Sequence, residues 1–212
     1  TAKRLGAIVT ATDVRPATKE QVESLGGKFL EVDPEMEKDA QTEGGYAKEM
    51  PPAYFAKQKK VAAEHITKQD IVITTALIQG RPAPVLVTEQ MVATMKPGAV
   101  IVDLAVEAGG NCPLSKLDQV VKTKNGVTII GHGNVAGRLA EDASALFAKN
   151  LLNFITPLVD PETKNLAIDW EDEIVKGTLV TRDGKVVHPM LTNKKPAGKA
   201  KKPASKPKPK GK

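Results

Sequence analysis

An acid follows directly on the first apolar run of the sequence. Residues 7–12 read AIVTAT, and Asp13, Val14 and Arg15 come next. In a dinucleotide-binding unit, the strand after the phosphate loop ends in an acid, whose carboxylate accepts hydrogen bonds from the adenosine ribose and repels a 2′-phosphate. An arginine close behind that acid can stack on the adenine ring. The same pattern is typical of a solvated turn, so the spacing alone leaves both interpretations open.

A glycine-rich segment further along could also hold a phosphate. Residues 131–137 read GHGNVAG, follow a strand pattern and precede a helix pattern. The spacing G-x-G-x-x-x-G can place a pyrophosphate on a helix N-terminus. However, no acid or arginine ends another β-branched strand about 20 residues later, as the dinucleotide pattern requires. We therefore interpret this segment as a crossover between two packing units.

A long charged segment without apolar periodicity covers residues 33–52. It contains Gly44, Gly45 and two large side chains, Tyr46 and Met50, for which the sequence offers no core. Long segments of this kind are typical of lids or of mobile surface loops. A lid that closes over a nucleotide and excludes water would use such side chains. The alternative of an ordinary surface loop stays open.

A further candidate lies at the end of the strand pattern 71–76, IVITTA, where Leu77 follows. Ligands of open α/β sheets bind beyond the carboxyl ends of the strands, so this end would face the nicotinamide half of a dinucleotide bound at Asp13.

No metal site is expected, because the three histidines are scattered without ligand spacing. Cys112 has no disulfide partner and no base nearby in the sequence, and we interpret it as structural.

Short β-branched runs alternate with helix patterns over residues 7–131. This alternation predicts βαβ units and a doubly wound, Rossmann-like α/β fold, whose parallel sheet is covered on both faces. The expected strands are 7–12, 28–32, 71–76, 99–105 and 126–130. The expected helices are 17–26, with Thr18 and Gln21 as a capping box and Gly26 as its stop, 53–66, and 88–98, with Thr88 as its cap.

The first seven residues, TAKRLGA, read as the end of a helix that Gly6 stops. A doubly wound nucleotide-binding fold begins with a strand and a glycine-rich turn before its first helix. We therefore expect the first strand of the sheet to be missing from this sequence or supplied by another segment.

The sequence after the glycine-rich segment predicts a second packing unit. The longest amphipathic helix pattern covers residues 139–156. Residues 173–180 and 185–188 flank an Asp-Gly turn and predict a hairpin. The expected domains are 1–137, which would bind the nucleotide, 138–192, with the long helix and the hairpin, and a disordered tail over 193–212.

The net charge of +6 belongs to the end of the chain. Residues 194–212 hold nine of the 31 basic residues and no acid, so the rest carries 22 basic against 25 acidic side chains, a net charge of −3. Lysines next to an anionic surface contribute about 1 kcal/mol each, so the tail could act as a tether. Nucleic acid is not an expected partner, because no aromatic residue lies among these lysines.

The apolar content of the whole sequence, 41%, excludes wholesale disorder. No run approaches the roughly 20 apolar residues of a membrane-spanning helix.

Five motifs occur in the order and at the separations of a known enzyme family. They are ATDVR (11–15), GGYAKEM (44–50), TTALI (74–78), VDLAVEAGGN (102–111) and ASALFAKNLLNF (143–154). Over residues 1 to about 190, the sequence resembles the NAD(H)-binding component of proton-translocating NAD(P) transhydrogenases, which is their alpha subunit or, where that subunit is split, its first portion. These proteins form one family with the alanine dehydrogenases.

The resemblance implies a function that spacing alone does not give. Such enzymes transfer hydride directly between NAD(H) on this component and NADP(H) on a partner component, without a metal, and couple the transfer to proton translocation through a membrane-spanning component. The NAD(H) component is a homodimer with two Rossmann-like subdomains. The sequence resembles those bacterial forms in which this component is a separate peripheral polypeptide on the cytoplasmic face of the inner membrane. Its catalytic residues would lie upstream of Thr1.

The resemblance also assigns roles to individual residues. The positions that match family contacts to the nucleotide are Asp13, Val14 and Arg15 around the adenosine, Gly45 in the closing loop, Gln58 and Leu77. Tyr46 and Met50 match the mobile loop that closes over NAD(H).

Two other functions stay open at this point. An alanine dehydrogenase would share this subdomain but reductively aminate pyruvate, and the motif GGYAKEM and the basic tail count against it. A non-enzymatic anchor that acts through the tail would not need Asp13.

Overall fold

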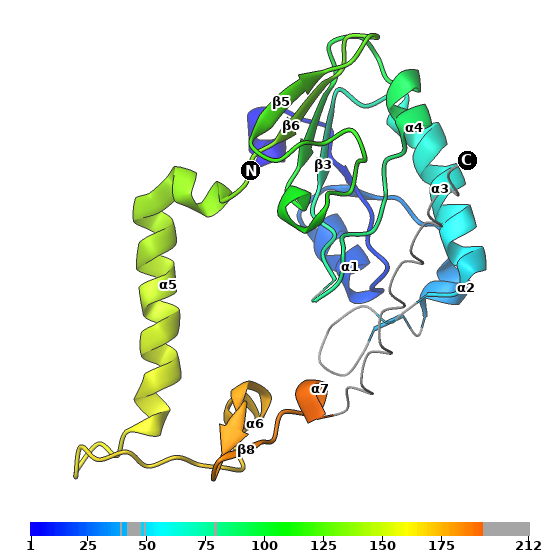
Figure 1. Ribbon diagram of the computed structural model, residues 1–212. Coiled ribbons are helices and arrows are strands. Elements are labelled where there is room, and N and C mark those ends of the chain that lie inside the picture. The colour runs from blue at the N-terminus through cyan, green and yellow to red at the C-terminus, as the bar shows by residue number, and fades with distance from the viewer. Residues whose placement is uncertain (39, 42–47, 49, 79, 193–212) are drawn as a thin grey trace, which may run out of the picture. The chain divides into compact units, whose positions relative to one another are not determined.

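The computed structural model describes residues 1–38, 40, 41, 48, 50–78 and 80–192. It divides into two compact units, Thr1–Arg138 and a second unit that begins at Leu139 (Figure 1). The expected tail lies outside the described residues. Among the residues that the structure describes, no helix is both long enough and apolar enough to cross a membrane.

A four-stranded sheet forms the centre of the first unit. Its strands, in spatial order, are β3 (Ile71–Thr74), β4 (Val100–Asp103), β6 (Thr128–Gly131) and β5 (Gln119–Lys122). β3, β4 and β6 are parallel, whereas β5 runs antiparallel to β6. The sequence predicted the three parallel strands but not β5, whose QVVK run is short and has only two apolar residues.

The core of this sheet lies on the face that two helices cover. These helices are α3 (Pro52–Ile66) and α4 (Glu89–Thr94). Ile101 of β4 and Ile129 of β6 are fully buried and belong to one cluster with Met91 of α4. Burial alternates along β4 and β6, as expected when successive side chains point to opposite faces and one face is packed better than the other.

Two predicted helix starts have different outcomes. The cap at Thr88 is confirmed, because its Oγ1 accepts a hydrogen bond from the backbone N of Met91 at 3.3 Å. The capping box at Thr18 is wrong, because α1 (Ala17–Ser24) has already begun one residue earlier, directly after a proline. The Thr18 hydroxyl instead donates a hydrogen bond to the carbonyl of Arg15 at 2.6 Å.

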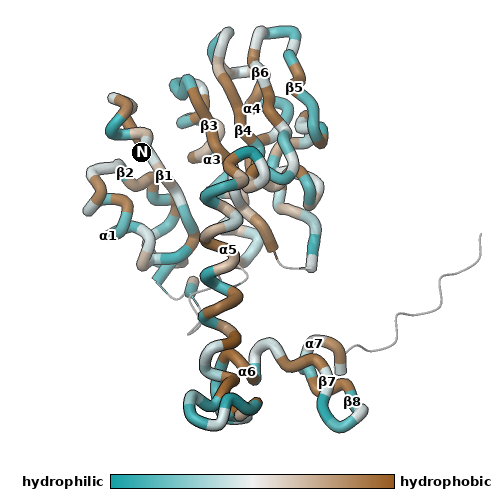
Figure 2. The backbone as a smooth tube through the Cα atoms, turned by 90° about the vertical axis from the view of Figure 1, so that its left-hand side faces the viewer, coloured by the Kyte–Doolittle hydropathy of each residue, from teal (hydrophilic) through white to brown (hydrophobic). Residues whose placement is uncertain are grey.

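A smaller parallel sheet, β1 (Thr10–Ala11) and β2 (Lys28–Phe29), precedes the larger one in the chain (Figure 2). Both strands are shorter than predicted, and each has a described neighbour on one edge only. The 3-10 helix η1 (Ala2–Leu5) ends at Gly6, whose φ is 87°, so the predicted helix end is confirmed. The described strands do not join the two sheets. In a doubly wound sheet the first strand would lie between β1 and β3, and this is the strand that the sequence predicted to be missing or supplied by another segment.

Three short helices complete the first unit. They are α2 (Pro34–Glu37) and the 3-10 helices η2 (Val106–Ala108) and η3 (Val135–Leu139), the last of which reaches the start of the second unit. η2 follows β4 and η3 follows β6, so both lie beyond the carboxyl ends of parallel strands. In an open α/β sheet this is the side where ligands bind.

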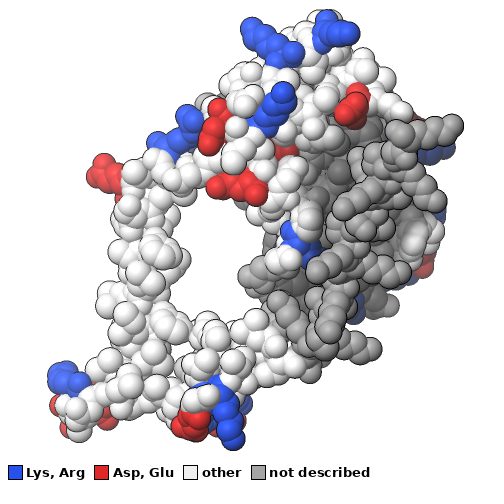
Figure 3. Space-filling view, viewed as in Figure 1, with Lys and Arg blue, Asp and Glu red and all other residues white. Residues whose placement is uncertain are grey.

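The second unit contains the predicted long helix, α5 (Ala140–Ile155), followed by the 3-10 helix η4 (Thr156–Leu158). Apolar side chains along α5 stay exposed, among them Leu146 at 67% and Phe147 at 63%. The middle of the visible face of α5 carries no Lys, Arg, Asp or Glu side chain (Figure 3). The amphipathic pattern therefore predicted the helix correctly, although the described residues do not bury its apolar face.

The predicted hairpin is present but shorter. β7 (Thr181–Arg182) pairs with β8 (Lys185–Val186) across the predicted Asp-Gly turn, and α7 (Pro189–Thr192) follows. The expected strand 173–180 is wrong, because α6 (Glu173–Thr178) occupies most of it. The preceding Asp172 accepts hydrogen bonds from two backbone amides at the start of α6, which favours a helix over an extended strand.

Candidate functional site

The turn that links β1 to α1 holds a closely paired acid and base. Arg15 donates to Asp13 Oδ1 from its backbone N and from Nε, each at 2.9 Å. Its Nη2 donates to Asp13 Oδ2 at 2.7 Å. The arginine side chain is 39% exposed and the aspartate side chain 31%, so both can be reached from solvent. This turn contains three of the predicted site residues, Asp13, Val14 and Arg15.

The pairing determines the charge on both groups. Partial burial raises the pKa of Asp13, but the hydrogen bonds and the positive charge of Arg15 outweigh it, and the pKa lies below its ordinary value. The hydrogen bond to Asp13 raises the pKa of Arg15 further. Asp13 is therefore ionised at neutral pH, which is the form that accepts hydrogen bonds from a sugar hydroxyl.

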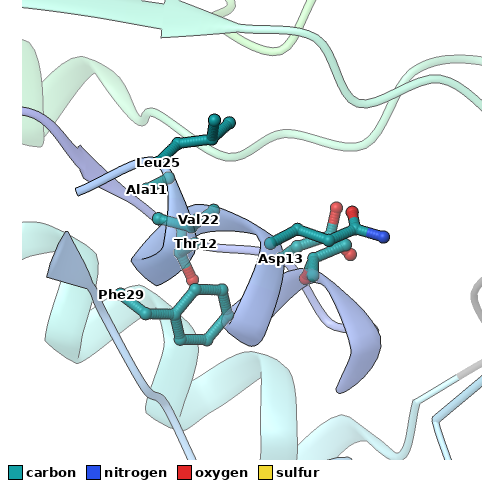
Figure 4. Close-up of a pocket in the computed structure, with 8 residues that line it drawn as sticks. Ala11, Thr12, Asp13, Val22, Leu25 and Phe29 are labelled. Atoms are coloured by element: carbon teal, nitrogen blue, oxygen red, sulfur yellow. The ribbon is translucent and has the colours of Figure 1, made fainter. Parts of the chain in front are cut away.

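A hollow of about 280 Å³ lies beside this turn. It opens between β1, β2 and α1, and most of its lining is apolar. Figure 4 shows Asp13 at one side of this hollow. The residues of the lining that it labels are Ala11, Thr12, Asp13, Val22, Leu25 and Phe29. A carboxylate beside an apolar surface is an arrangement that can hold a sugar next to an aromatic base.

A buried tyrosine lies on the other side of the turn. Tyr54 of α3 is fully buried in a small cluster with Ala40 and Met50, and Val14 packs against this cluster. The expectation that Met50 has no core to join is therefore wrong, since Met50 is only 7% exposed. The ring of Tyr54 is the apolar partner of Met50. Tyr54 belongs to the helix predicted over residues 53–66, which lies outside the charged segment 33–52.

A hydrogen bond fixes the orientation of this tyrosine. Tyr54 Oη donates to Glu37 Oε1 at 2.8 Å, and both side chains are buried. Burial, followed by the hydrogen bond to Glu37, raises the pKa of Tyr54. Asp33 caps α2 and forms an ion pair with Lys57 of α3, so a second contact ties the same two helices together. The neighbourhood of Val14 is thus held by polar as well as apolar contacts.

The ends of the predicted mobile loop are fixed near this cluster. The backbone N of Lys48 donates to the carbonyl of Ala40 at 2.8 Å, and Met50 follows in the buried cluster. Gly45 and Tyr46, which the resemblance assigns to the loop, lie outside the described residues. The structure therefore describes both flanks of the segment and leaves its predicted closure a hypothesis.

The residues after β3 are held by an asparagine that the sequence analysis did not single out. Asn111 is fully buried, and its Oδ1 accepts from the backbone N of Ala76 at 3.0 Å. Its Nδ2 donates to the carbonyls of Ala76 at 2.9 Å and of Pro84 at 2.7 Å. Leu77, the next residue, is 61% exposed. Asn111 thus fixes the backbone from which Leu77 projects.

Asp103 organises the loop that contains this asparagine. It is fully buried at the end of β4, and its oxygens accept from the backbone N of Ala105, the backbone N of Cys112 and the hydroxyl of Ser115. Cys112 is buried beside it, and burial is the first cause that raises the pKa of its thiol, which agrees with a structural role. The signal for this loop in the sequence is an acid inside an apolar strand pattern.

The glycine-rich segment 131–137 uses its amides within the chain. The backbone N of Gly133 donates to Asp118 Oδ1 at 3.0 Å, and that of Asn134 donates to Glu107 Oε2 at 3.3 Å. Carboxylates that occupy these donors would also repel a pyrophosphate. The contacts therefore support the interpretation of this segment as a crossover and not as a phosphate-binding turn.

The remaining predicted residue, Gln58, lies half-buried on α3, one turn beyond Tyr54. Of the other predicted residues, Val14 and Met50 pack in the cluster of Tyr54, and Asp13 and Arg15 flank Val14 in the same turn. Leu77 instead follows β3 at the end of the larger sheet. Within the part of the chain that the structure describes, no three His, Cys, Asp or Glu side chains are grouped as a metal site would need.

Comparisons with known proteins identify relatives of this chain. A family model described as alanine dehydrogenase/PNT, C-terminal domain, matches residues 1–189. The chain is 65% identical over 192 residues to the first portion of the split NAD(P) transhydrogenase subunit alpha of Rhodospirillum rubrum, and the match covers 91% of this chain and 50% of that protein. The chain spans about half the length of the curated relatives it matches.

Solved structures agree with this relationship. A transhydrogenase from Sinorhizobium meliloti is similar with a TM-score of 0.70 and 52% identity, over 88% of this chain and 47% of that one. An L-alanine dehydrogenase is similar with a TM-score of 0.61 and 25% identity, over 90% of this chain and 47% of that one. These likenesses confirm the predicted Rossmann-like α/β class. Together with the family model, they show that the chain belongs to the alanine dehydrogenase/PNT family, of which it carries the C-terminal domain.

Proposed function

We propose that this chain is the NAD(H)-binding part of the alpha subunit of a proton-translocating NAD(P) transhydrogenase. Hydride would pass between NAD(H) on this chain and NADP(H) on a partner component, coupled to proton movement through a membrane-spanning component. The observation that carries the proposal is the ionised Asp13 at the end of β1, in a chain that is 65% identical to the first portion of a transhydrogenase subunit alpha.

The carboxylate of Asp13 has enough hydrogen-bond acceptor sites to contact a ribose as well as Arg15. A carboxylate offers about four acceptor sites, and Arg15 uses three of them, two on Oδ1 and one on Oδ2. The described contacts leave one site on Oδ2 for a ribose hydroxyl, which is a donor. The hollow lined by Phe29 and Val22 lies next to this carboxylate. In this proposal Asp13 and Val14 hold the adenosine, and Gly45 and Gln58 add further contacts to the nucleotide.

The nicotinamide half would lie near Leu77. The nucleotide supplies the hydride chemistry, and the chain's own residues bind and orient it and exclude water. Direct transfer needs the reacting atoms about 3–3.5 Å apart, so the backbone that contacts the nicotinamide must be rigid. Asn111 supplies this rigidity, with two hydrogen bonds to Ala76, which precedes Leu77, and a third to the carbonyl of Pro84. The loop that contains Tyr46 and ends at the buried Met50 would close over the bound nucleotide.

The proposal includes partners and a location. The relatives are named as alpha subunits, some of them as one portion of a split subunit, which supports an assembly with other subunits. We propose a homodimer that binds the NADP(H) component and the membrane-spanning component from the cytoplasmic face of the inner membrane. No metal would take part in the transfer.

An alanine dehydrogenase is the second candidate, because a structure of that activity has the same fold. The identities of 25% with that structure and 65% with the transhydrogenase subunit favour the first candidate. Mixing the protein with the membrane and NADP(H) components separates the two. We expect NADH to reduce an NADP analogue without pyruvate or ammonium. Turnover of pyruvate with ammonium, in the absence of this transfer, would favour the dehydrogenase.

Binding of NADH tests the site itself. In the protein as the cell makes it, Asp13→Asn should weaken NADH binding by about 1–3 kcal/mol, which is the scale of a hydrogen bond to a charged group. Isothermal titration calorimetry would measure the change. Asp70→Asn is a matched control, because it also removes one charge, from an exposed ion pair with Lys96. Equal affinity of the wild type and Asp13→Asn would exclude Asp13 from the site.

A further inference from the structure

The turn between β5 and β6, residues 123–127, contains the dipeptide Asn125-Gly126. Asn125 is the only asparagine of the sequence that a glycine follows. Asparagine is one of the thermolabile residues, because its side-chain amide can be lost. The loss is fastest before a glycine, which has no side chain to hinder its own backbone N. The sequence therefore marks this turn as a place where the chain can be modified chemically.

The side chain of Asn125 joins this turn to the end of helix α4. Its Nδ2 donates to the carbonyl of Val92 at 2.9 Å and makes longer contacts of 3.4 Å with the carbonyls of Ala93 and Met95. The last carbonyls of a helix lack regular partners within the helix, so a donor from another segment stabilises the helix end. The half-buried Asn125 is such a donor.

The groups that would react are held by other partners in this turn. The backbone N of Gly126 donates to the carbonyl of Thr123 at 3.0 Å, and the hydroxyl of Thr123 donates to Asn125 Oδ1 at 2.7 Å. The backbone N of Val127 donates to Thr123 Oγ1 at 3.0 Å, and Val127 is fully buried in the core cluster of the larger sheet. Reaction between Gly126 and Asn125 therefore requires the turn to open.

We propose that Asn125 is a deamidation site and that opening of the turn over residues 123–127 sets its rate. In the open turn, the backbone N of Gly126 loses its proton and attacks Cγ of Asn125. A bond forms between that N and Cγ, the bond from Cγ to Nδ2 breaks, and ammonia leaves. Water then opens the five-membered imide to give aspartate or isoaspartate. The site lies at the amino end of β6, opposite the end where a nucleotide would bind, so the inference is independent of the proposed function.

The product has the wrong charge for its surroundings. A carboxylate at residue 125 has no hydrogen to donate to the three carbonyls, and the negative end of the α4 dipole repels it. Asn125→Asp copies the aspartate product and should lower the midpoint of thermal unfolding, followed by circular dichroism, by about 4 °C or more. Gln119→Glu makes the same change from amide to acid on an exposed side chain of β5, and its midpoint should stay within about 2 °C of the wild type.

Mass spectrometry measures the reaction itself. The full chain and a synthetic peptide of residues 119–131 are incubated at pH 8, and a sample digested at zero time corrects for reaction during digestion. Trypsin releases residues 125–138, which also contain Asn134, an internal control followed by valine. We expect Asn125 to react at least about tenfold more slowly in the folded chain than in the peptide, because it must wait for the turn to open. Thr123→Val removes the hydroxyl that holds Asn125 and should react faster than the wild type.

Four results would overturn the inference. Equal rates in the folded chain and the peptide would show that the turn does not control the reaction, and equal rates at Asn125 and Asn134 would show that Asn125 is no special site. Folded wild type and Thr123→Val that both stay unmodified after the peptide has reacted completely would show that the turn does not open. An Asn125→Asp variant as stable as Gln119→Glu would show that the amide does not hold α4.

Discussion

At the scale of single residues, buried polar groups set the shape of the candidate site. The side chains of Asn111 and Asp103 are fully buried, and all their described hydrogen bonds go to the loops beyond β3 and β4. Side chains that satisfy buried backbone groups fix one loop conformation, because an unpaired group would cost more than the hydrogen bond gains. The exposed Leu77 therefore depends on a residue that would not itself contact a ligand.

Asn111→Ala should destabilise the protein by about 2–3 kcal/mol, because it leaves the amide of Ala76 and two carbonyls without partners. Urea unfolding measured by circular dichroism would show the change. Asn165→Ala is the control, since Asn165 is exposed, and we expect a change within about 0.5 kcal/mol. A loss below about 1 kcal/mol for Asn111→Ala would mean that the loop satisfies its backbone in another way.

Tyr54 gives a prediction at high pH. Its folded-state pKa is raised, first by burial and then by Glu37, so the neutral form is favoured in the folded state. The stability from this neutral hydroxyl is complete below about pH 10, the ordinary tyrosine pKa, and is lost as the pH rises above it. The sequence has two tyrosines, so the variant Tyr46→Phe leaves Tyr54 as the only source of a tyrosinate signal.

In that variant, absorbance at 295 nm should stay flat through about pH 10 and rise together with the loss of the circular dichroism signal. A titration midpoint near pH 10 in folded protein would show that Tyr54 is accessible to solvent. Tyr54→Phe should resist alkaline unfolding better than the wild type does, because it has no hydroxyl to ionise.

At the scale of elements, the sequence correctly predicted the helix and the helix start that apolar periodicity and a capping residue determine. The long helix α5 and the cap at Thr88 follow from patterns that local contacts enforce. The segment 173–180 is rich in β-branched residues and was predicted as a strand, but the cap at Asp172 starts a helix there. In the site, Asp13 was visible as an acid after an apolar run. The partnership of Met50 with Tyr54 was not, because it depends on the packing of segments that periodicity does not relate.

Asp172→Ala should destabilise the second unit by about 1 kcal/mol, which is typical for loss of a helix cap. Its Oδ1 accepts from the backbone N of Ile174 at 2.8 Å and of Val175 at 3.0 Å. Trp170 is the only tryptophan and lies against Arg182, with its ring centre 4.0 Å from the guanidinium carbon. Its fluorescence therefore follows this unit during urea unfolding. Asp172→Asn keeps an acceptor and should lose much less. Equal losses would show that charge, and not capping, is responsible.

At the scale of the whole molecule, charge is divided unevenly along the chain. Nine lysines between residues 194 and 212 change the sign of the net charge, which is −3 without them and +6 with them. Clustered charge acts on an oppositely charged surface over about 10 Å at moderate salt, so the tail can act without any contact to the nucleotide site. Association with anionic surfaces and nucleotide binding should therefore be separable in this protein.

Removal of residues 194–212 should abolish sedimentation with vesicles that contain anionic lipid and leave NADH affinity within about twofold of the wild type. Since each lysine contributes about 1 kcal/mol at such a surface, the full chain should bind at low salt and dissociate as salt is added. A variant with the nine lysines replaced by glutamine keeps the length of the tail and should behave like the truncated chain. If the glutamine variant still sediments, charge is not the cause. If truncation weakens NADH binding instead, the tail belongs to the nucleotide site, and the division between the two functions is wrong.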